Sequence, residues 1–383
     1  MALEQLIGKA EKHPHFNSLT GQLKSSIKRL YLKGLSGSSK SLFSAAIIRN
    51  TSNNHLFILP DKESAAYYYT DLLNLSGDNK IFFFPSSYKR SVRYQQKDNA
   101  NIILRNEVLN AVGGLKKKPD DSAGHFIVVT CPEALAEKVV THQKLLKNTL
   151  KLVKGEKIGI EFIEEVLHEY RFQRSDFVYE PGQYAIRGGI VDIYSFAGKE
   201  PYRIDFFGDE VESIRSFNIE TQLSEQHFEQ ISILPDVQKF SINDVKESFL
   251  DFIPSDTLVW ITDTRFVADT LDDIFENTDK QRITEDNITW EKELNLITSH
   301  YFIDCLNRFK TLESGARPFY TPDQEFVFNS SLQPAFNKNF NHLRRIGQEP
   351  GLVRRPVSRR ELAERQDGAR GLLAIAADER PLA

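Results

Sequence analysis

The stretch "GLSGSSKSLFSAAIIRNTSNNHLFILP", from Gly34 to Pro60, gives the strongest indication of fold class. Its first eight residues fit the phosphate-binding pattern G-x-x-x-x-G-K-[ST] at Gly34, Lys40 and Ser41. The residues after Ser41 predict a helix, and the apolar run from His55 to Pro60 predicts a buried strand of a parallel α/β sheet. A loop, a helix and a strand in this order are typical of a nucleotide-binding domain.

One position departs from the pattern, because Ser39 stands where the second glycine belongs. That glycine lets successive backbone N–H groups surround a phosphate in a conformation that penalises a Cβ atom. A nucleotide hydrolase also needs a carboxylate for magnesium at the end of a hydrophobic strand, and the strand predicted before Cys131 is followed by Pro132-Glu133 instead of Asp-Glu. We therefore predict a degenerate P-loop without catalytic residues, in which Lys40 is a solvated lysine.

The composition favours a protein with protein partners. A chain of 383 residues with 40% hydrophobic and 27% charged residues is long enough and apolar enough for two or three soluble domains. The net charge of −4 does not fit a dedicated nucleic-acid binder. Cys131 and Cys305 lie far apart, which favours reduced structural thiols over a disulfide or metal site and indicates a cytoplasmic protein. The chain has no apolar run of membrane-spanning length, so no membrane contact is expected.

The first region, about Ser36 to Lys151, alternates apolar strands with helical stretches and predicts an open α/β sheet. Within it, the connection from Tyr88 to Asn101 combines Arg90, Arg93 and Tyr94. Such residues can follow a phosphate backbone and stack on bases, which makes them candidates for nucleic-acid contact. The alternative is an ordinary exposed loop of the α/β domain.

The second region begins near Gly155 and predicts a small α+β module. Ile160, Ile163, Leu167 and Tyr170 recur at helical spacing and predict one apolar helix face. Strands follow: the stretch from Pro181 to Tyr194 contains Gly188-Gly189, which predicts a bulge or bend, and two later strands flank Gly208-Asp209-Glu210, which predicts a hairpin.

The third region, about Leu234 to Lys338, predicts a strand and a helix that complete the first α/β domain. Four of its aspartates, Asp263, Asp269, Asp272 and Asp273, lack the spacing of a calcium loop and predict a solvated helix face with no metal. The tail from Leu343 has nine arginines and no lysine. This composition indicates a vector-derived or disordered tail, with a basic interaction tail as the alternative.

Two runs of the second region, Arg174 to Phe196 and Pro201 to Ser224, resemble the inserted domain that UvrB shares with the bacterial transcription-repair coupling factors. The resemblance is carried by a long ordered set: Pro181-Gly182, Arg187-Gly188-Gly189, Asp192, Arg203, Phe206-Phe207, Asp209-Glu210 and Thr221-Gln222. It is weaker over residues 20 to 335, and the run "FFGDEVESIRSFNIETQ" is more similar to the coupling factors than to UvrB.

The resemblance implies a fold and a division into domains. The fold is α/β, a degenerate RecA-like (P-loop helicase-like) parallel sheet domain interrupted by an inserted small α+β domain. The implied parts are residues 1–152 and 236–340 for the two halves of the RecA-like domain, 153–235 for the inserted UvrA-interaction domain, and 341–383 for the tail. The degenerate P-loop, Gly34, Ser39, Lys40 and Ser41, is then a relic.

The resemblance also implies a function, that of a UvrA-recruiting module in transcription-coupled nucleotide excision repair in the bacterial cytoplasm. The chain itself is then expected to be no enzyme and to need no cofactor. The implied UvrA-binding residues are Arg174, Phe177, Arg187, Gly188 and Gly189. The longer parent protein is expected to be an ATP-driven DNA translocase that also binds RNA polymerase and double-stranded DNA through regions outside this chain.

Three alternatives stay open. One is an ATP-dependent DNA-remodelling enzyme of the UvrB type, although such proteins keep an intact P-loop and a long tyrosine-rich hairpin at the place of the short Tyr88 to Asn101 connection. Another is a sequence-independent DNA-binding module that uses Arg90, Arg93 and Tyr94. At the level of one residue, Arg187 either binds the partner or only pairs with Asp192 or Glu210 within its own sheet.

Overall fold

A computed structural model of the chain describes residues 2–76, 80–87, 99–115, 125–196, 198, 200–236, 245–282 and 296–329. All of them belong to a unit that runs from residue 1 to residue 331. The predictions made for Arg90, Arg93 and Tyr94, and for the tail from residue 341, lie outside the described residues.

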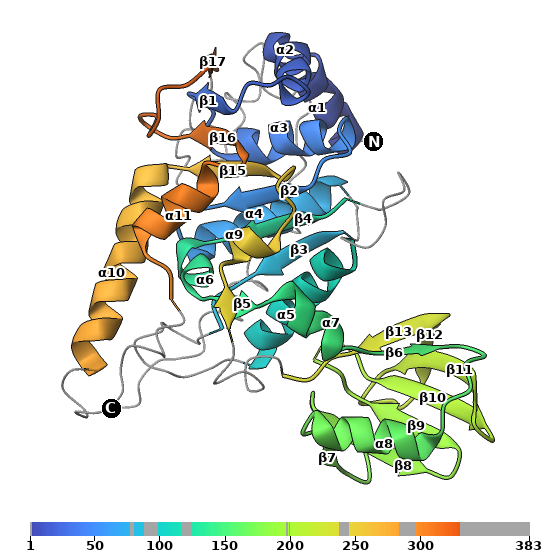
Figure 1. Cartoon of the computed structure of the whole chain (residues 1–383). Coiled ribbons are helices and arrows are strands. Elements are labelled where there is room, and N and C mark those ends of the chain that lie inside the picture. Colours follow the sequence, from blue (N-terminus) through green and yellow to red (C-terminus); the bar gives the residue numbers. More distant parts are fainter. Residues whose placement is uncertain are drawn as a thin grey trace, which may run out of the picture. The chain divides into compact units, whose positions relative to one another are not determined.

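The larger sheet is parallel and has seven strands (Figure 1). In spatial order these are β17 (Gln324–Val327), β1 (Arg29–Lys33), β16 (Lys310–Ser314), β15 (Leu258–Thr262), β2 (His55–Ile58), β4 (Ile127–Thr130) and β3 (Ile81–Phe84). The inner strands β2 and β4 are buried at every position, as expected for a parallel sheet covered on both faces.

The sheet is built from both ends of the described chain. β1 to β4 precede residue 150, whereas β15, β16 and β17 follow residue 245 and complete the sheet between and beside the earlier strands. Of these three strands, β15 was predicted, from the apolar run that ends at Thr262. The predicted fold class, an α/β domain interrupted by a smaller module, is confirmed.

Helices follow most of these strands and enclose the larger core. They are α1 (Ala2–Glu11), α2 (Pro14–Leu23), α3 (Ser38–Arg49), α4 (Lys62–Ser76), α5 (Asn99–Leu115), α6 (Pro132–Ala136), α7 (His142–Lys147), α9 (Phe249–Phe252), α10 (Thr264–Arg282) and α11 (Ser299–Leu306). A short antiparallel ladder joins β5 (Val139–Val140) to β14 (Lys246–Glu247). Among the described residues, no helix is both long and apolar enough to cross a membrane.

The second sheet has six strands and is mostly antiparallel. In spatial order these are β12 (Ser224–His227), β11 (Glu210–Phe217), β10 (Tyr202–Phe207), β9 (Ile190–Ile193), β8 (Gln183–Arg187) and β7 (Gln173–Arg174). One helix, α8 (Ile160–Glu169), and a two-stranded ladder of β6 (Leu150–Val153) with β13 (Gln230–Ile233) belong to the same part of the chain.

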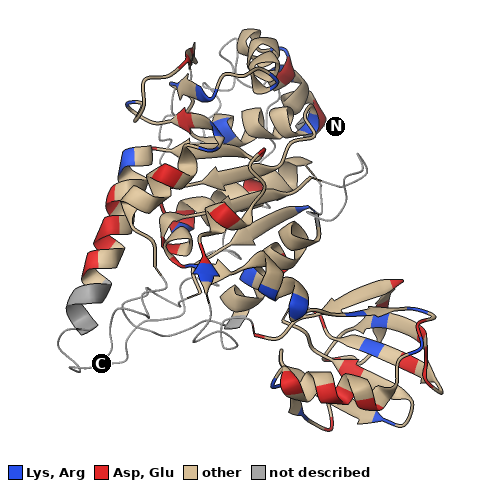
Figure 2. Cartoon of the chain, viewed as in Figure 1, with Lys and Arg blue, Asp and Glu red and all other residues tan. Residues whose placement is uncertain are grey.

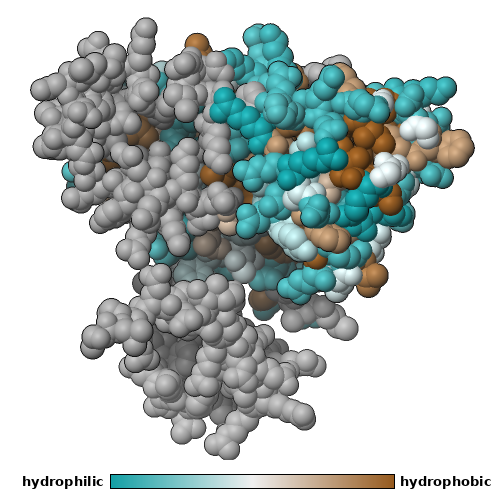
Figure 3. Space-filling model, turned by 90° about the horizontal axis from the view of Figure 1, so that it is seen from below, coloured by the Kyte–Doolittle hydropathy of each residue, from teal (hydrophilic) through white to brown (hydrophobic). Residues whose placement is uncertain are grey.

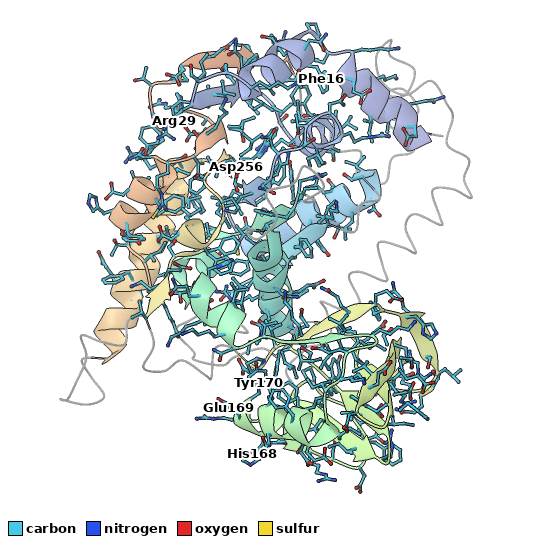
Figure 4. The ribbon with its side chains drawn as sticks, turned by 45° about the vertical axis from the view of Figure 1, so that its right-hand side comes forward. Phe16, Arg29, His168, Glu169, Tyr170 and Asp256 are labelled. Atoms are coloured by element: carbon cyan, nitrogen blue, oxygen red, sulfur yellow. The ribbon has the colours of Figure 1, made fainter. Side chains whose placement is uncertain are left out.

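This sheet has its own hydrophobic core. Ile163, Leu167 and Tyr170 are buried there, which confirms the predicted helix face. His168 and Glu169 are exposed beside Tyr170 at the end of α8 (Figure 4). Alternate strand residues such as Val191 and Ile204 supply the sheet side of the core.

The Gly188-Gly189 pair is a tight turn and not the bulge or bend that we expected. Arg187 pairs with Ile190, so the two glycines form a two-residue hairpin loop, and the positive φ of Gly188 (60°) suits such a turn. The irregularity lies one strand further on, where the register of β10 against β11 shifts between Asp205 and Phe206. The alternation of apolar residues along a strand does not distinguish a glycine pair that forms a hairpin turn from one that forms a bulge.

Candidate partner-binding site

The predicted P-loop relic, from Gly34 to Ser41, packs against the chain that follows β17. Gly34 has a φ of 77°, and a Cβ atom there would overlap the backbone oxygen of Phe328. Gly37 precedes the first residue of α3 with a φ of 57°. The Ser39 hydroxyl, at the position of the missing glycine, donates to the Ser36 carbonyl at 2.5 Å. The glycine at 34 therefore has a structural reason that involves no phosphate.

Lys40 is not the solvated loop lysine that we predicted. It lies in the first turn of α3 and lines a cavity of about 20 Å³. Burial lowers the pKa of its amine, and the aromatic rings of Phe57, Tyr68 and Trp260 line the same cavity. A space of this size holds about one water molecule and no phosphate group. Lys40 is partly buried because β2 and β15, which are far apart in the sequence, are neighbours in the sheet and line the same cavity.

The Ser41 hydroxyl, which would hold magnesium in an intact P-loop, is committed elsewhere. It donates to the Asp71 carboxylate of α4 at 2.8 Å and to the Ser38 carbonyl at 3.1 Å, and the residue is only 2% exposed. Ser44 and Tyr68 bond to each other one turn along, at 2.7 Å. These bonds tie α3 to α4.

The cavity at Lys40 is lined by the end of a different strand from the one that we searched for a magnesium carboxylate. β4, which ends at Thr130, lies four strands from β1, whereas Thr262 at the end of β15 lines the cavity. The following Asp263 has a φ of 58° and accepts the N–H of Phe266 at 3.1 Å, so it caps α10. Sequence order could not reveal this neighbour, because β15 returns to the sheet after the insertion.

On the second sheet, Arg187 lies at the end of β8, on the face opposite the core. Its guanidinium pairs with the Asp192 carboxylate, donates to the Asp176 carbonyl at 2.8 Å and lies 5.2 Å from the centre of the Phe177 ring. The side chain remains 38% exposed. Arg187 therefore pairs within its sheet and presents an edge to solvent, so the two readings of this residue are compatible.

Asp192 is the centre of this arrangement. It is 1% exposed and also accepts two bonds from Arg203, at 2.7 and 2.9 Å. The hydrogen bonds to Asp192 raise the pKa of the Arg203 guanidinium. Arg203 in turn lies 4.3 Å from the centre of the Phe217 ring and is mostly buried. One buried carboxylate faces two guanidinium groups, so the cluster carries a net positive charge, and Arg187 is the member that reaches solvent.

Phe177 lies beside this cluster, whereas Arg174 of β7 contacts α8 on the core side of the sheet. Arg174 is 60% exposed and pairs with Glu164 of α8 at 2.8 Å. Phe177 is 49% exposed and its ring centre is 6.4 Å from that of Tyr179, which is 57% exposed. The structure thus places Phe177 against Arg187, whereas Arg174 is held by a different partner.

Comparison with known proteins identifies this part of the chain. Residues 150–238 match the family described as the UvrB interaction domain. These residues are similar to a UvrB interaction domain. The match covers every strand of the second sheet and all the partner-binding residues that we predicted.

The relatives of the chain belong to two groups of repair proteins. A transcription-repair-coupling factor of Bacillus subtilis is 31% identical over 221 residues, which are 57% of this chain and 18% of that protein. One from Escherichia coli is 30% identical over 109 residues, 28% of this chain and 10% of that protein. UvrABC system protein B of Fusobacterium nucleatum is 23% identical over 317 residues, 82% of this chain and 46% of that protein. The resemblance to the UvrB-like region of the coupling factors is confirmed, and the chain spans less than half of each of these relatives.

Sequence reasoning missed two exposed aromatic residues of this part of the chain, Tyr179 and Phe207. Phe207 is 80% exposed, and the N–H of Phe206 beside it donates to the Gly189 carbonyl at 2.8 Å. In sheet order, β10, which ends at Phe207, lies next to β9, and the loop that contains Phe177 joins β7 to β8. Alternation could have found Phe207, because Ile204 and Phe206 point into the core. We call Phe177, Tyr179, Arg187 and Phe207, with the turn between them, the hairpin surface.

On the face seen in Figure 3, hydrophobic side chains gather in one area and hydrophilic side chains surround them.

The predicted acidic helix face contains no group of side chains that could hold a metal ion, among the residues that the structure describes. Of the four aspartates, Asp263 caps α10 and Asp272 accepts the N–H and hydroxyl of Ser299 at 3.0 and 2.7 Å. These two have structural roles.

Proposed function

We propose that this chain is the UvrA-recruiting module of a transcription-repair coupling factor and acts in transcription-coupled nucleotide excision repair. The observation that carries the proposal is the hairpin surface, an exposed arginine–aromatic group on a UvrB interaction domain. The relatives named transcription-repair-coupling factor support the pathway. For the longer protein, we propose an ATP-driven DNA translocase that binds RNA polymerase and double-stranded DNA through other regions.

The chemistry of the hairpin surface suits a protein interface. Arginine and aromatic residues are enriched among the residues that contribute most binding energy, because a planar guanidinium binds carboxylates and a ring supplies desolvated area. Arg187 is already oriented by Asp192 and Phe177, so little side-chain entropy is lost on binding. Gly188 next to it lets a partner approach the backbone, since there is open space where its Cβ would lie.

Binding of purified UvrA to this chain tests the proposal. We expect Arg187→Ala and Arg174→Ala each to weaken UvrA binding by about 1 to 3 kcal/mol. Lys154→Ala is the matched control, because Lys154 is an exposed cation of the same domain that pairs only weakly, with Glu229 at 3.7 Å. Unchanged affinity in the double arginine variant would contradict the assignment of these residues, and absence of binding in the unmodified chain would contradict the function.

The stability of the same variants must also be measured, because Arg187 pairs with the buried Asp192 and its removal affects folding as well as binding. Loss of Arg187 removes one of the two partners of a buried carboxylate, so we expect a stability loss of about 1 kcal/mol. Arg174 forms a surface pair, for which the expected loss is below about 1 kcal/mol. Weaker UvrA binding by Arg174→Ala at unchanged stability therefore gives the cleaner test.

The UvrB-type enzyme is the competing function, and a nucleotide titration separates it from the adaptor. We propose that the chain uses no nucleotide cofactor, on the grounds of the small cavity at Lys40 and the commitment of the Ser41 hydroxyl to Asp71. We expect no shift of the thermal transition when ATP and magnesium are added. Micromolar affinity with magnesium-dependent turnover would favour the enzyme. Arg90, Arg93 and Tyr94, outside the described residues, remain predicted nucleic-acid contacts, which salt-dependent DNA binding would test.

A further inference from the structure

A second arginine–aromatic group lies on the α/β part of the chain, in the first turn of α10 and the loop after β16. Arg265 and Phe266 begin the helix, and Arg317 and Phe319 belong to the loop. The Arg265 guanidinium lies 5.3 Å from the centre of the Phe319 ring, and Phe266 is 48% exposed. We call these four residues the Arg265 patch.

The patch is held in place from beneath by a buried carboxylate. Glu313, 6% exposed, accepts the N–H of Thr264 at 3.1 Å and the N–H of Phe319 at 2.9 Å, so it joins the start of α10 to the loop. The Tyr31 hydroxyl donates to the Gly315 carbonyl at 2.8 Å and fixes the beginning of the same loop. A surface that is already ordered loses little entropy when it binds a partner.

Arg29 of this region bonds to neighbouring side chains, whereas Arg265 and Arg317 face solvent. Phe319 packs edge-on against Tyr320, with ring centres 4.8 Å apart, and the Arg29 guanidinium lies 4.2 Å from the Tyr320 ring centre. Arg29 (labelled in Figure 4) also donates to Thr311 at 3.1 Å and Asn307 at 2.6 Å, so its role is structural. Arg265 and Arg317 are exposed, and neither forms a hydrogen bond or ion pair with another described residue. Their donors are available to a partner.

We propose that the Arg265 patch binds an acidic segment of a partner protein. The Arg265 and Arg317 guanidinium groups, together with the partly exposed Phe319 ring and the exposed Phe266 ring, match carboxylates flanked by apolar side chains. The acidic residues that follow Arg265 along α10, Asp269, Asp272, Asp273 and Glu276, repel any anion that extends along the helix, so a short acidic segment fits better than a long phosphate backbone (Figure 2). The patch is short and bordered by this negative face, which suits a segment that presents a few carboxylates in one place.

The experiment measures binding of a labelled peptide in which glutamate alternates with leucine. The double variant Arg265→Glu/Arg317→Glu is compared with Arg49→Glu, an exposed arginine of the same part of the chain that pairs with Glu4 at 3.0 Å. We expect the double variant to weaken peptide binding by about tenfold or more, and Arg49→Glu to leave it unchanged. Phe266→Ala should weaken binding without changing the net charge.

Several results would overturn the proposal. These are the absence of peptide binding to the unmodified chain, equal weakening by Arg49→Glu, or tighter binding of a single-stranded oligothymidylate through the same two arginines. Dimerisation that depends on Arg265 would also overturn it, because the occupant would then be a second copy of the chain. UvrA binding should be unaffected in the double variant, so failure here is distinguishable from failure of the proposed function.

Discussion

Asp192 is a buried residue that holds an exposed arginine in place. It accepts bonds from Arg203 and Arg187 while almost wholly removed from solvent. Removing one partner of a buried charge leaves the rest uncompensated, whereas an exposed pair contributes little. At this position, stability and the orientation of Arg187 therefore depend on the same carboxylate.

We predict that Asp192→Asn lowers the free energy of unfolding by about 3 kcal/mol or more, measured by urea denaturation. Arg203→Ala should cost more than Arg187→Ala, because the Arg203 side chain is 15% exposed and that of Arg187 is 38% exposed. Asp205→Asn is the control: its pair with Arg215, at 3.0 Å, is more exposed and should matter less. Equal losses in all the variants would contradict the central role of Asp192.

His55 provides a second prediction at this scale, of pH dependence. The indole N–H of Trp260 donates to its Nδ1 at 3.0 Å, and burial lowers the pKa of the ring to about 3. The folded protein therefore keeps the ring neutral, while the unfolded chain takes up a proton below about pH 6.5. Stability from this residue is complete above that pH and is lost as the pH falls toward 3.

The measurement is urea denaturation at pH 7.5, 6 and 5. We expect His55 to account for a loss of about 1.4 kcal/mol for each pH unit well below 6.5. His55→Gln lowers stability at pH 7.5, because it removes the acceptor of Trp260, and it should flatten the slope. A variant as steep as the unmodified chain would show that other groups cause the acid sensitivity. His13, whose pKa burial also lowers, supplies part of the remaining slope.

At the scale of elements, the P-loop relic is explained by packing between a loop and an edge strand. Gly34 has a positive φ and lies against the backbone oxygen of Phe328, and the Phe328 N–H donates to the Lys33 carbonyl at 2.8 Å. The loop after β1 therefore supports the chain that follows β17. A glycine is needed here whether or not a phosphate is bound.

We predict that Gly34→Ala destabilises the fold by about 2 kcal/mol or more, because a rigid backbone atom occupies the space of the new methyl group. Gly8→Ala is the matched control: this glycine is inside α1 and nothing lies within 4 Å of its Cβ position. The control should gain up to about 1 kcal/mol, since alanine favours a helix. Thermal unfolding compares the two, and an unchanged Gly34→Ala midpoint would contradict the packing explanation.

Local patterns predicted the elements better than the contacts between them. The apolar spacing of α8 and the runs of β2, β4 and β15 predicted these elements, because each depends on residues close in sequence. The surroundings of Lys40 could not be predicted, since Trp260 reaches the cavity only through the order of strands in the sheet. Arg187 was correctly chosen as an exposed arginine, but its bond to Asp176 depends on the path of the loop after β7.

At the scale of the whole molecule, the insertion enters and leaves the α/β part at one place. Leu150, at the start of β6, pairs with Ile233 at the end of β13, so the two ends lie side by side in an antiparallel ladder. The core of the inserted module comes from residues 150 to 233, apart from Ile102 and Ile103 of α5. The larger core draws on both flanking segments. An insertion with adjacent ends and its own core places little strain on its host.

This arrangement predicts that the two parts fold separately. Replacing residues 151–232 by a short Gly-Ser linker should leave the α/β part folded, because neighbours in an antiparallel ladder are only about 5 Å apart and a short loop closes at small entropic cost. The isolated segment 150–236 should also unfold cooperatively, and it should retain UvrA binding while the linker variant loses it. Circular dichroism and thermal melting of both products check the folding. If the linker variant had no cooperative transition, the α/β sheet would depend on the inserted module, and Ile102 would be the contact to examine first.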